Sequence, residues 1–239
     1  MFKSAWNVTP RISNLNPRID VETNIGGSIN LLDSAVRHKV KRFVFISSGG
    51  TVYGNALKMP IPEDHPTFPN CSYGITKLAI ENYLRIYHSE MGLPSCSLRL
   101  SNPYGEFQRV KSNQGVIPVF CYKILKGENI DIWGDGNVVR DFVYIGDVMS
   151  AIASALLKND IVGEINIGSG IGTSINQLIT IIENVVGKKA QCVFHPKRRF
   201  DVPVNVLDIN KASLLLQWRP QVKLEKGIRY SIDWVKKIM

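Results

Sequence analysis

Two residues one helical turn apart, Tyr73 and Lys77, are the pair whose types and spacing best fit proton-transfer chemistry. In a helix, side chains four residues apart share a face, with Cβ atoms roughly 5–6 Å apart. A free tyrosine has a pKa of about 10, too high for a base at neutral pH, but a neighbouring ammonium favours the phenolate. Such a phenol could take a proton from a substrate hydroxyl while hydride leaves the same carbon.

The spacing alone is not specific, because Tyr122 and Lys126 share it. In "CYKILKG" that second pair is typical of the solvated edge of an amphipathic helix. Tyr73 instead follows, after one loop, a strand-like run that ends in "SSGGT". Ligands of open α/β sheets bind beyond the carboxyl ends of parallel strands, where a Ser or Thr hydroxyl could bridge the phenol and a substrate oxygen. We therefore favour Tyr73 as the acid/base candidate.

The elements that must position this pair alternate between helix and strand. Apolar residues at spacings of three and four predict a helix over 22–38, and "KRFVFISS" is typical of a buried parallel strand. A helix over about 75–91 and a strand over 95–102 follow. This alternation predicts the α/β class, with a partial doubly wound, Rossmann-like parallel sheet.

The second half of the chain predicts shorter elements, which we interpret as a smaller C-terminal α/β domain woven onto the first, with a boundary near residue 103. We divide the chain into 1–102 and 103–239. The expected helices lie at about 115–126, 146–158, 174–186, 210–216 and 223–237. The expected strands are "IDIWG", "DFVYI", "EINIGSG" and "AQCVFHP".

The glycines of "INIGSGIGTSI" raise the question of a dinucleotide-binding loop. Their spacing is G-x-G-x-G instead of G-x-G-x-x-G, and the next strand ends without the acidic residue that holds a ribose hydroxyl. We therefore favour a strand-to-helix turn in which Thr173 or Ser174 caps the helix.

Composition is that of an ordinary globular protein with a positive charge. The 239 residues are 44% hydrophobic and 21% charged, with a formal net charge of +9. The charge favours anionic partners, but the basic residues are scattered without interleaved aromatics, which disfavours nucleic acid. The start lacks a signal-peptide core and no run is long enough to span a membrane. Four widely spaced cysteines, without metal-ligand spacing, predict free thiols, no metal site and a cytoplasmic location.

Seven segments carry a resemblance that covers nearly the whole chain, in order and spacing. They are "NIGGSINLLDSA", "RFVFISSGGTVYG", "SYGITK", "LRLSNPYG", "IWGDGNVVRDFVYIGDV", "NIGSGIGTSINQLI" and "RRFDVPVNVLDINKA". Together they resemble the extended short-chain dehydrogenase/reductase family, and most of all its UDP-sugar 4-epimerases of the UDP-glucose 4-epimerase type. The resemblance implies NAD as cofactor, a UDP-sugar as substrate, and a role in nucleotide-sugar metabolism and polysaccharide biosynthesis. It also implies a homodimer.

The resemblance assigns roles residue by residue. Tyr73 would be the acid/base, tuned by Lys77, with Thr51 and Ser48 as the catalytic hydroxyls. The implied cofactor contacts are Asn24, Ser47, Tyr73, Lys77 and Ser101. The implied substrate contacts are Asn102, Gly115, Val116, Arg140, Arg198 and Asp201. A guanidinium fork suits phosphate oxygens, so the two arginines would pair with the diphosphate.

Two of these assignments have structural alternatives. Arg140 could instead form an ion pair with Asp141 or Asp147, because surface ion pairs are common and do not require a functional role. Asn102 could instead be a turn residue that precedes Pro103.

The sequence departs from the family pattern in three places. Gly49 replaces a serine that is catalytic in many epimerases, so Thr51 becomes the hydroxyl candidate, and Tyr144 replaces a histidine. Family members normally begin about 60–80 residues earlier, the length of two βα units. "MFKSAWN" corresponds to the fourth strand, and no glycine-rich loop is found ahead of it.

The leading hypothesis is an NAD-dependent UDP-sugar 4-epimerase that works through a 4-keto intermediate. One alternative is a catalytically silent remnant that binds sugar nucleotides, and another is an NAD(P)-dependent sugar-nucleotide reductase, which would use the same groups. A dehydratase is disfavoured, because Gly50 and Thr51 occupy the positions of its Asp-Glu pair.

Overall fold

Four parallel strands form the main sheet, in the spatial order β1-β2-β3-β7. They are β1 (Phe2–Lys3), β2 (Phe43–Ser48), β3 (Ser95–Leu100) and β7 (Gly163–Ile167). The computed structural model describes residues 1–3, 10–110, 115–198 and 202–239. Residues of β3 are buried throughout, as expected for a central strand that is covered on both faces.

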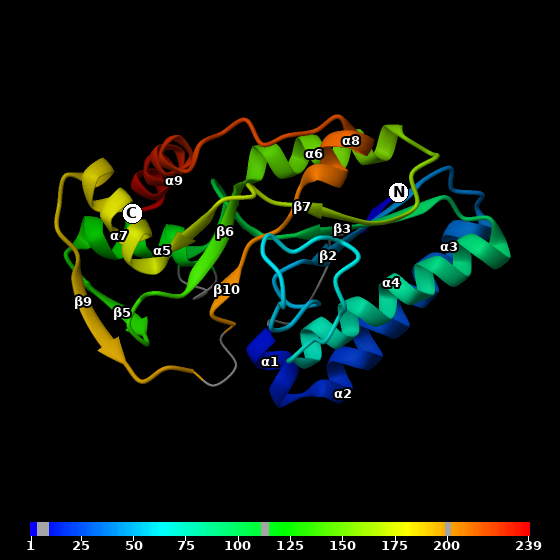
Figure 1. Ribbon diagram of the computed structural model, residues 1–239, viewed down its shortest axis with the longest axis horizontal. Helices are drawn as coiled ribbons and strands as arrows, with labels where there is room; N and C mark the ends of the chain where they lie inside the picture. Colours follow the sequence, from blue (N-terminus) through cyan, green and yellow to red (C-terminus); the bar gives the residue numbers. More distant parts are fainter. Residues whose placement is uncertain (4–9, 111–114, 199–201) are drawn as a thin grey trace.

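Helices cover both faces of this sheet (Figure 1). One face carries the helices of the first hundred residues: α1 (Pro10–Leu15), α2 (Pro17–Asp20), the π-helix η1 (Val21–Gly26), α3 (Gly27–Arg37) and α4 (Ser72–Met91). The opposite face carries α6 (Ile145–Leu157) and α8 (Asn210–Leu216). This three-layer arrangement confirms the Rossmann-like α/β class.

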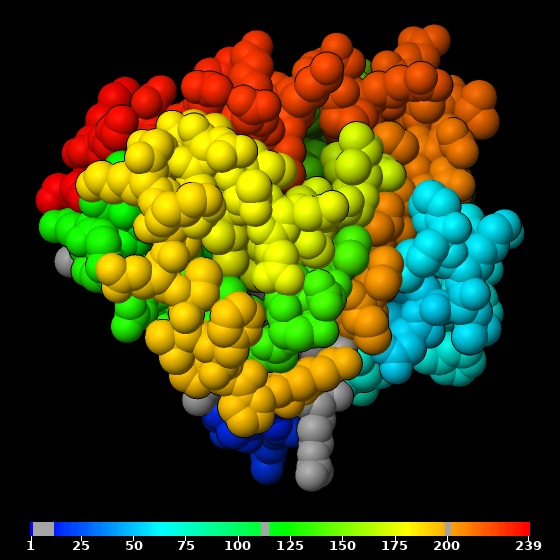
Figure 2. Space-filling model, turned by 60° about the vertical axis from the view of Figure 1, so that its left-hand side comes forward, coloured from blue at the N-terminus to red at the C-terminus, as the bar shows by residue number. Residues whose placement is uncertain are grey.

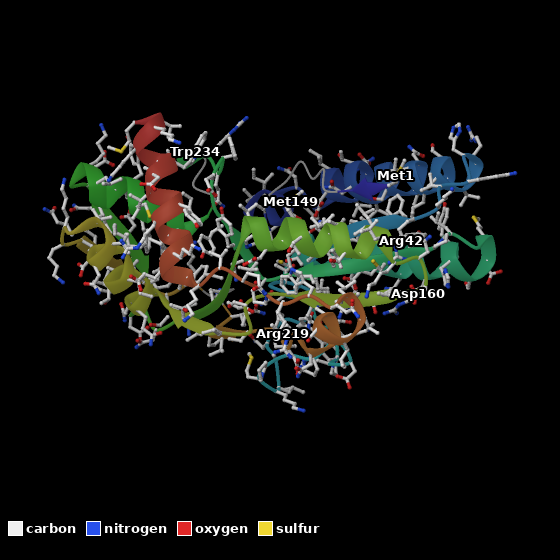
Figure 3. The ribbon with its side chains drawn as sticks, turned by 90° about the horizontal axis from the view of Figure 1, so that it is seen from above. Met1, Arg42, Met149, Asp160, Arg219 and Trp234 are labelled. Atoms are coloured by element: carbon white, nitrogen blue, oxygen red, sulfur yellow. The ribbon has the colours of Figure 1, made fainter. Side chains whose placement is uncertain are left out.

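Arg42, labelled in Figure 3, directly precedes β2 and forms hydrogen bonds at the C-terminal end of α6 and in the segment after it. Its side chain is 4% exposed. Nε donates to the carbonyl of Ala155 at 2.9 Å, and Nη1 donates to the carbonyl of Ile161 at 2.6 Å. A buried guanidinium is tolerated here because backbone oxygens accept its hydrogen bonds.

The second half of the chain forms two further small sheets. One has the order β10-β6-β4, with β8 antiparallel to β6, and the other pairs β5 with β9. The strands are β4 (Asn102–Tyr104), β5 (Asn129–Trp133), β6 (Val139–Tyr144), β8 (Gly172–Ser174), β9 (Gln191–His195) and β10 (Val204–Asn205). The helices α5 (Val116–Lys126), α7 (Ile175–Val186) and α9 (Leu224–Ile238) pack together against them.

The two halves interleave in space. β7 lies late in the chain but pairs with β3, in register from Cys96–Gly163 to Leu100–Ile167. Figure 2 shows the later half, coloured green to red, over most of the visible face, with the cyan segment near residue 60 at one edge. The boundary near residue 103 remains a prediction.

The predicted helix over 22–38 is the element that differs most. Its first part is the π-helix η1, which continues into α3 without a break. A π-turn adds one residue per hydrogen-bonded ring, so it shifts the faces that a regular period predicts. None of the helices in the described ranges is long and apolar enough to cross a membrane.

Candidate functional site

The first turn of α4 places Tyr73 beside the turn that follows β2. A Cβ atom at Gly74 would lie 2.6 Å from the carbonyl oxygen of Thr51, closer than side chains ever approach. Glycine at position 74 is therefore what allows α4 to begin against the Thr51 turn. The backbone of Gly74, which follows Tyr73, therefore lies against the Thr51 turn, and the pairing of the Tyr73 phenol with the Thr51 hydroxyl stays a prediction.

The side chain of Lys77 points from α4 toward strand β2 of the main sheet. Its side chain is 3% exposed, and Nζ donates to the carbonyl of Ile46 at 2.6 Å. Nζ also lies 4.8 Å from the ring centroid of Phe45 and 5.5 Å from that of Tyr73. The two predicted residues therefore do share one face of α4, with the ammonium next to the phenol ring.

The protonation of Tyr73 differs from the expectation. Burial raises the pKa of its phenol to about 12, and Cys71 and Asp20 act in the same direction. Burial therefore acts against the lowering that the sequence predicts from Lys77. The positive charge of a bound oxidised nicotinamide would act in the direction opposite to burial.

The hydroxyl candidates follow β2. The backbone N–H groups of Thr51 and Val52 donate to the carbonyl of Ser48, which forms a tight turn. Thr51 Oγ1 is buried and has no hydrogen-bond partner among the described residues. The hydroxyl of Ser47, by contrast, already has a protein partner, because it donates to the Glu81 carboxylate.

Two predicted cofactor contacts lie deep in the fold. Asn24, on η1, is 3% exposed, and its Nδ2 donates to Asp20 at 2.8 Å. Ser101, directly after β3, has a buried Oγ with no partner among the described residues. A buried hydroxyl without a partner costs about 1–3 kcal/mol. Unpaired hydroxyls after both β2 and β3 fit a polar ligand bound at the carboxyl ends of these strands.

The predicted substrate contacts are only partly open to a ligand. Nδ2 of Asn102 donates to the carbonyl of Asp141 at 3.0 Å, which joins β4 to β6. Gly115 precedes α5 with φ of +83°, and Val116 is the first residue of that helix. Asp201 lies outside the described residues.

The two predicted diphosphate arginines contact different parts of the chain. Nη1 of Arg140 donates to the carbonyl of Val202 at 2.7 Å. The guanidinium carbon of Arg198 lies 3.6 Å from the ring centroid of Trp133. No ion pair joins Arg140 to Asp141 or Asp147 within the described ranges, so that alternative is wrong.

Asp141 instead explains the glycine-rich turn. Its fully buried carboxylate accepts from the N–H and Oγ of Ser169, from the N–H of Gly170, and from the N–H of Leu207. Burial raises the pKa of this carboxyl despite these donors. Ser174 then caps α7 in a capping box with Gln177. The motif is therefore a strand-to-helix turn, as favoured from its spacing.

A buried charged network behind the site was missed by the sequence reasoning. Arg99 on β3 and Glu81 on α4 form an ion pair at 2.6 Å with both side chains at most 2% exposed. Nη1 of Arg99 also donates to the phenol oxygen of Tyr53, which donates to Asn166 on β7. A charged residue inside the apolar run "SCSLRL" is the signal that could have found it.

The comparisons with known proteins agree on one family. The model of the NAD dependent epimerase/dehydratase family matches residues 4–168. A Thermotoga maritima UDP-glucose 4-epimerase, solved with UDP-glucose, is 38% identical with a TM-score of 0.96, over 99% of this chain and 77% of that one. A Thermus thermophilus UDP-glucose 4-epimerase, solved with NAD, is 32% identical with a TM-score of 0.92, over 100% and 78%. A dTDP-4-dehydro-6-deoxyglucose reductase of Escherichia coli is 38% identical over 94% of this chain and 71% of its own.

Proposed function

This chain belongs to the NAD-dependent epimerase/dehydratase family, and we propose that it inverts C4 of a UDP-sugar through a transient 4-keto intermediate. The observation that carries the proposal is the Tyr73–Lys77 pair, in which the ammonium lies 5.5 Å from the phenol ring centroid, on the first turns of α4 that begin against the Thr51 turn after β2. Bound NAD supplies the hydride acceptor and donor.

The residues of this chain supply the proton and the positioning. In the proposed reaction Tyr73, as a phenolate once the positive charge of an oxidised nicotinamide lowers its pKa, would take the proton from the C4 hydroxyl as hydride leaves and would return it when hydride returns. The Lys77 ammonium would hold the phenol in place from the sheet side. The Thr51 hydroxyl, which has no protein partner in the described ranges, would bridge the phenol and the substrate oxygen. The guanidinium groups of Arg140 and Arg198 are the diphosphate contacts that we propose.

The buried hydroxyls support NAD as the cofactor. Ser101 and Thr51 each present a polar atom that no described protein group satisfies, and a nicotinamide with its ribose offers matching donors and acceptors. Asn24 and Lys77 line the same end of the sheet from η1 and α4.

The direct test measures conversion of UDP-glucose to UDP-galactose. Tyr73→Phe should lower kcat at least about 100-fold, because general acid–base catalysis contributes that much or more. Tyr122→Phe, which removes the phenol of the other Tyr-x-x-x-Lys pair, is the matched control and should leave kcat unchanged. Equal losses in both variants, or turnover that survives Tyr73→Phe, would contradict the proposal.

Because the chain is also similar to a reductase, reduction of a 4-keto sugar nucleotide should be assayed as the second candidate activity. A reductase would consume NADH or NADPH in stoichiometric amounts with a 4-keto sugar nucleotide, whereas an epimerase shows no net consumption. Purified protein that binds UDP but neither retains NAD nor turns over either substrate would favour the silent alternative.

A homodimer and a cytoplasmic location remain predictions. All four cysteines are free in the structure, which supports a reducing compartment. Sedimentation equilibrium of the purified chain would measure its oligomeric state.

A further inference from the structure

A buried carboxylate that the proposed function does not use lies at the junction of α2, η1 and α4. Asp20, the last residue of α2, is 0% exposed. Its Oδ1 accepts from Asn24 Nδ2 at 2.8 Å, and its Oδ2 accepts from Thr76 Oγ1 at 3.0 Å and Ser72 Oγ at 3.3 Å. The hydroxyl of Ser13 on α1 also donates to Oδ2.

The partners of Asp20 are all neutral within the described part of the chain, where no Lys, Arg or His forms an ion pair with it. Removing a carboxylate from water is expensive unless hydrogen bonds compensate for the lost solvation. Four donors from three elements, α1, η1 and α4, converge on this one side chain. Such convergence fixes the donors relative to one another, since each must keep its geometry to satisfy the charge.

The donors lie directly beside the candidate catalytic residues. Ser72 and Thr76 each precede a site residue by one position, Tyr73 and Lys77 respectively. Residues 72 and 76 share one face of α4, and residues 73 and 77 share the face about 100° further round. The carboxylate therefore holds one side of the first turn while the neighbouring side presents the phenol and the ammonium.

We propose that Asp20 is a positioning residue for the reaction: its carboxylate locks the first turn of α4, which carries Tyr73 and Lys77, against η1, which carries Asn24. The inference rests on the proposed function, because it assigns Asp20 to the same site. Asp20 itself touches neither substrate nor cofactor in this assignment.

The charge of Asp20 has a second, electrostatic consequence. After burial and Cys71, it is a further cause of the raised pKa of Tyr73, and after burial it also raises the pKa of the Cys71 thiol. Among the residues that the structure describes, the charged or titratable groups near the phenol include Lys77 on α4, Cys71 at its N-cap and Asp20 on α2. Removal of the Asp20 charge should therefore ease ionisation of both Tyr73 and Cys71.

The test compares Asp20→Asn with Asp33→Asn, which removes a carboxylate from α3 that accepts from Tyr87 instead. We expect Asp20→Asn to lower kcat by up to about 100-fold, the effect of a misplaced catalytic group, with a smaller change in KM. The acidic limb of its kcat profile, along which Tyr73 loses its proton and becomes the base, should move to lower pH. Asp33→Asn should retain the wild-type values.

A second readout needs neither cofactor nor turnover. In a Cys192→Ser background, which removes the exposed cysteine, the rate of iodoacetamide modification reports Cys71, because Cys96 and Cys121 are buried. Asp20→Asn should move the pH midpoint of this reaction downward, and Asp33→Asn should not. If the wild type fails to convert UDP-glucose, the epimerase proposal fails, and the Cys71 profile alone decides the role of Asp20.

The outcomes are separable. A folded Asp20→Asn protein with wild-type kcat, or with a wild-type Cys71 profile, overturns the inference. So does an equal loss of kcat in Asp33→Asn. If Asp20→Asn does not fold, Thr76→Val keeps the charge and removes one donor: reduced kcat with an unshifted Cys71 profile supports positioning, and unchanged kcat overturns it.

Discussion

At position 49 the main chain passes too close to a neighbour to carry a side chain. A Cβ atom there would lie 2.6 Å from Cδ1 of Leu207 and 3.3 Å from the carbonyl oxygen of Arg99. Leu207 is fully buried, in a small cluster with Val52, Tyr53 and Ile61. This contact gives a physical reason for glycine at a position where many epimerases carry a serine. Thr51 is then the hydroxyl that we propose for the role of that serine.

Restoring that serine should therefore destabilise the protein. We expect Gly49→Ser to lower the free energy of unfolding by about 1–3 kcal/mol, because Leu207 must move within a packed core. The measurement is equilibrium unfolding in urea. Gly50→Ser is the matched control, since its Cβ would meet only Ser48 Oγ at 3.8 Å and should be tolerated. Equal effects at both positions would show that Leu207 does not set the cost.

The sequence predicts single residues well only where local spacing decides their geometry. The four-residue separation of Tyr73 and Lys77 was enough to place them on one face. The hydroxyl side chains of Thr173 and Ser174 were enough to predict a cap, in which Ser174 Oγ accepts from the N–H of Gln177. Burial by segments distant in sequence raises the pKa of Tyr73, against the lowering that the sequence predicts from Lys77. Ser47 was expected near the cofactor, but its partner Glu81 is 34 residues away in the chain.

α4 is the element on which the site depends, because it contacts the sheet through charges as well as apolar side chains. Near its start, Lys77 donates to β2, and one turn later Glu81 pairs with Arg99 of β3. Both acid and base are buried, so the loss of one partner would leave an uncompensated charge in the interior. The pair thereby fixes the rotation of α4 about its axis.

Removal of the Arg99 guanidinium should show how much the buried ion pair with Glu81 stabilises the packing of α4 on the sheet. We expect Arg99→Met to lower the free energy of unfolding by about 3–5 kcal/mol, because the Glu81 carboxylate would remain buried without a partner. Arg85→Met breaks the pair with Glu164, in which Arg85 is 55% exposed, and should cost at most about 1 kcal/mol. Urea unfolding of the two variants gives the comparison, and similar losses would argue against a special role for the buried pair.

Most elements of five or more residues were predicted from the sequence, down to the seven-residue helix over 210–216, which is α8, whereas strands of two or three residues were not. The helix over 75–91 and the strand over 95–102 agree with α4 and β3 to within a few residues. The two- and three-residue strands β4, β8 and β10 carry no periodic pattern, because their pairing with β6 is decided by tertiary contacts. The π-turn η1 also escapes a period-based prediction.

At the scale of the molecule, the second half of the chain completes the first. β7 supplies the fourth strand of the main sheet, and its Asn166 joins the phenol of Tyr53 to the carbonyls of Ile61 and Asp208. The division into two woven halves stays a prediction. The sequence did not identify Tyr53 as the buried partner of Asn166, because an aromatic residue in a loop carries no signal of its depth.

Three tyrosines with raised pKa values make the stability of the whole protein sensitive to alkaline pH. Burial is the first cause that raises the pKa of Tyr53, Tyr73 and Tyr144 to about 12, whereas an unfolded tyrosine ionises at about 10. Below pH 10 both states hold these protons, and the stabilisation is fully present. Between about pH 10 and 12 the unfolded chain releases protons that the folded chain retains, so the free energy of unfolding falls as pH rises.

Tyr53→Phe should therefore flatten this alkaline loss, since Tyr53 is fully buried and its phenol would no longer titrate. One tyrosine contributes a slope of up to about 1.4 kcal/mol per pH unit in that window. Urea unfolding at several pH values from 9 to 12 measures the slope independently of the stability that the substitution costs at neutral pH. Tyr83→Phe, at an exposed position of α4, is the control and should keep the wild-type slope. An unchanged slope in Tyr53→Phe would mean that this phenol ionises in the folded protein as readily as in the unfolded chain.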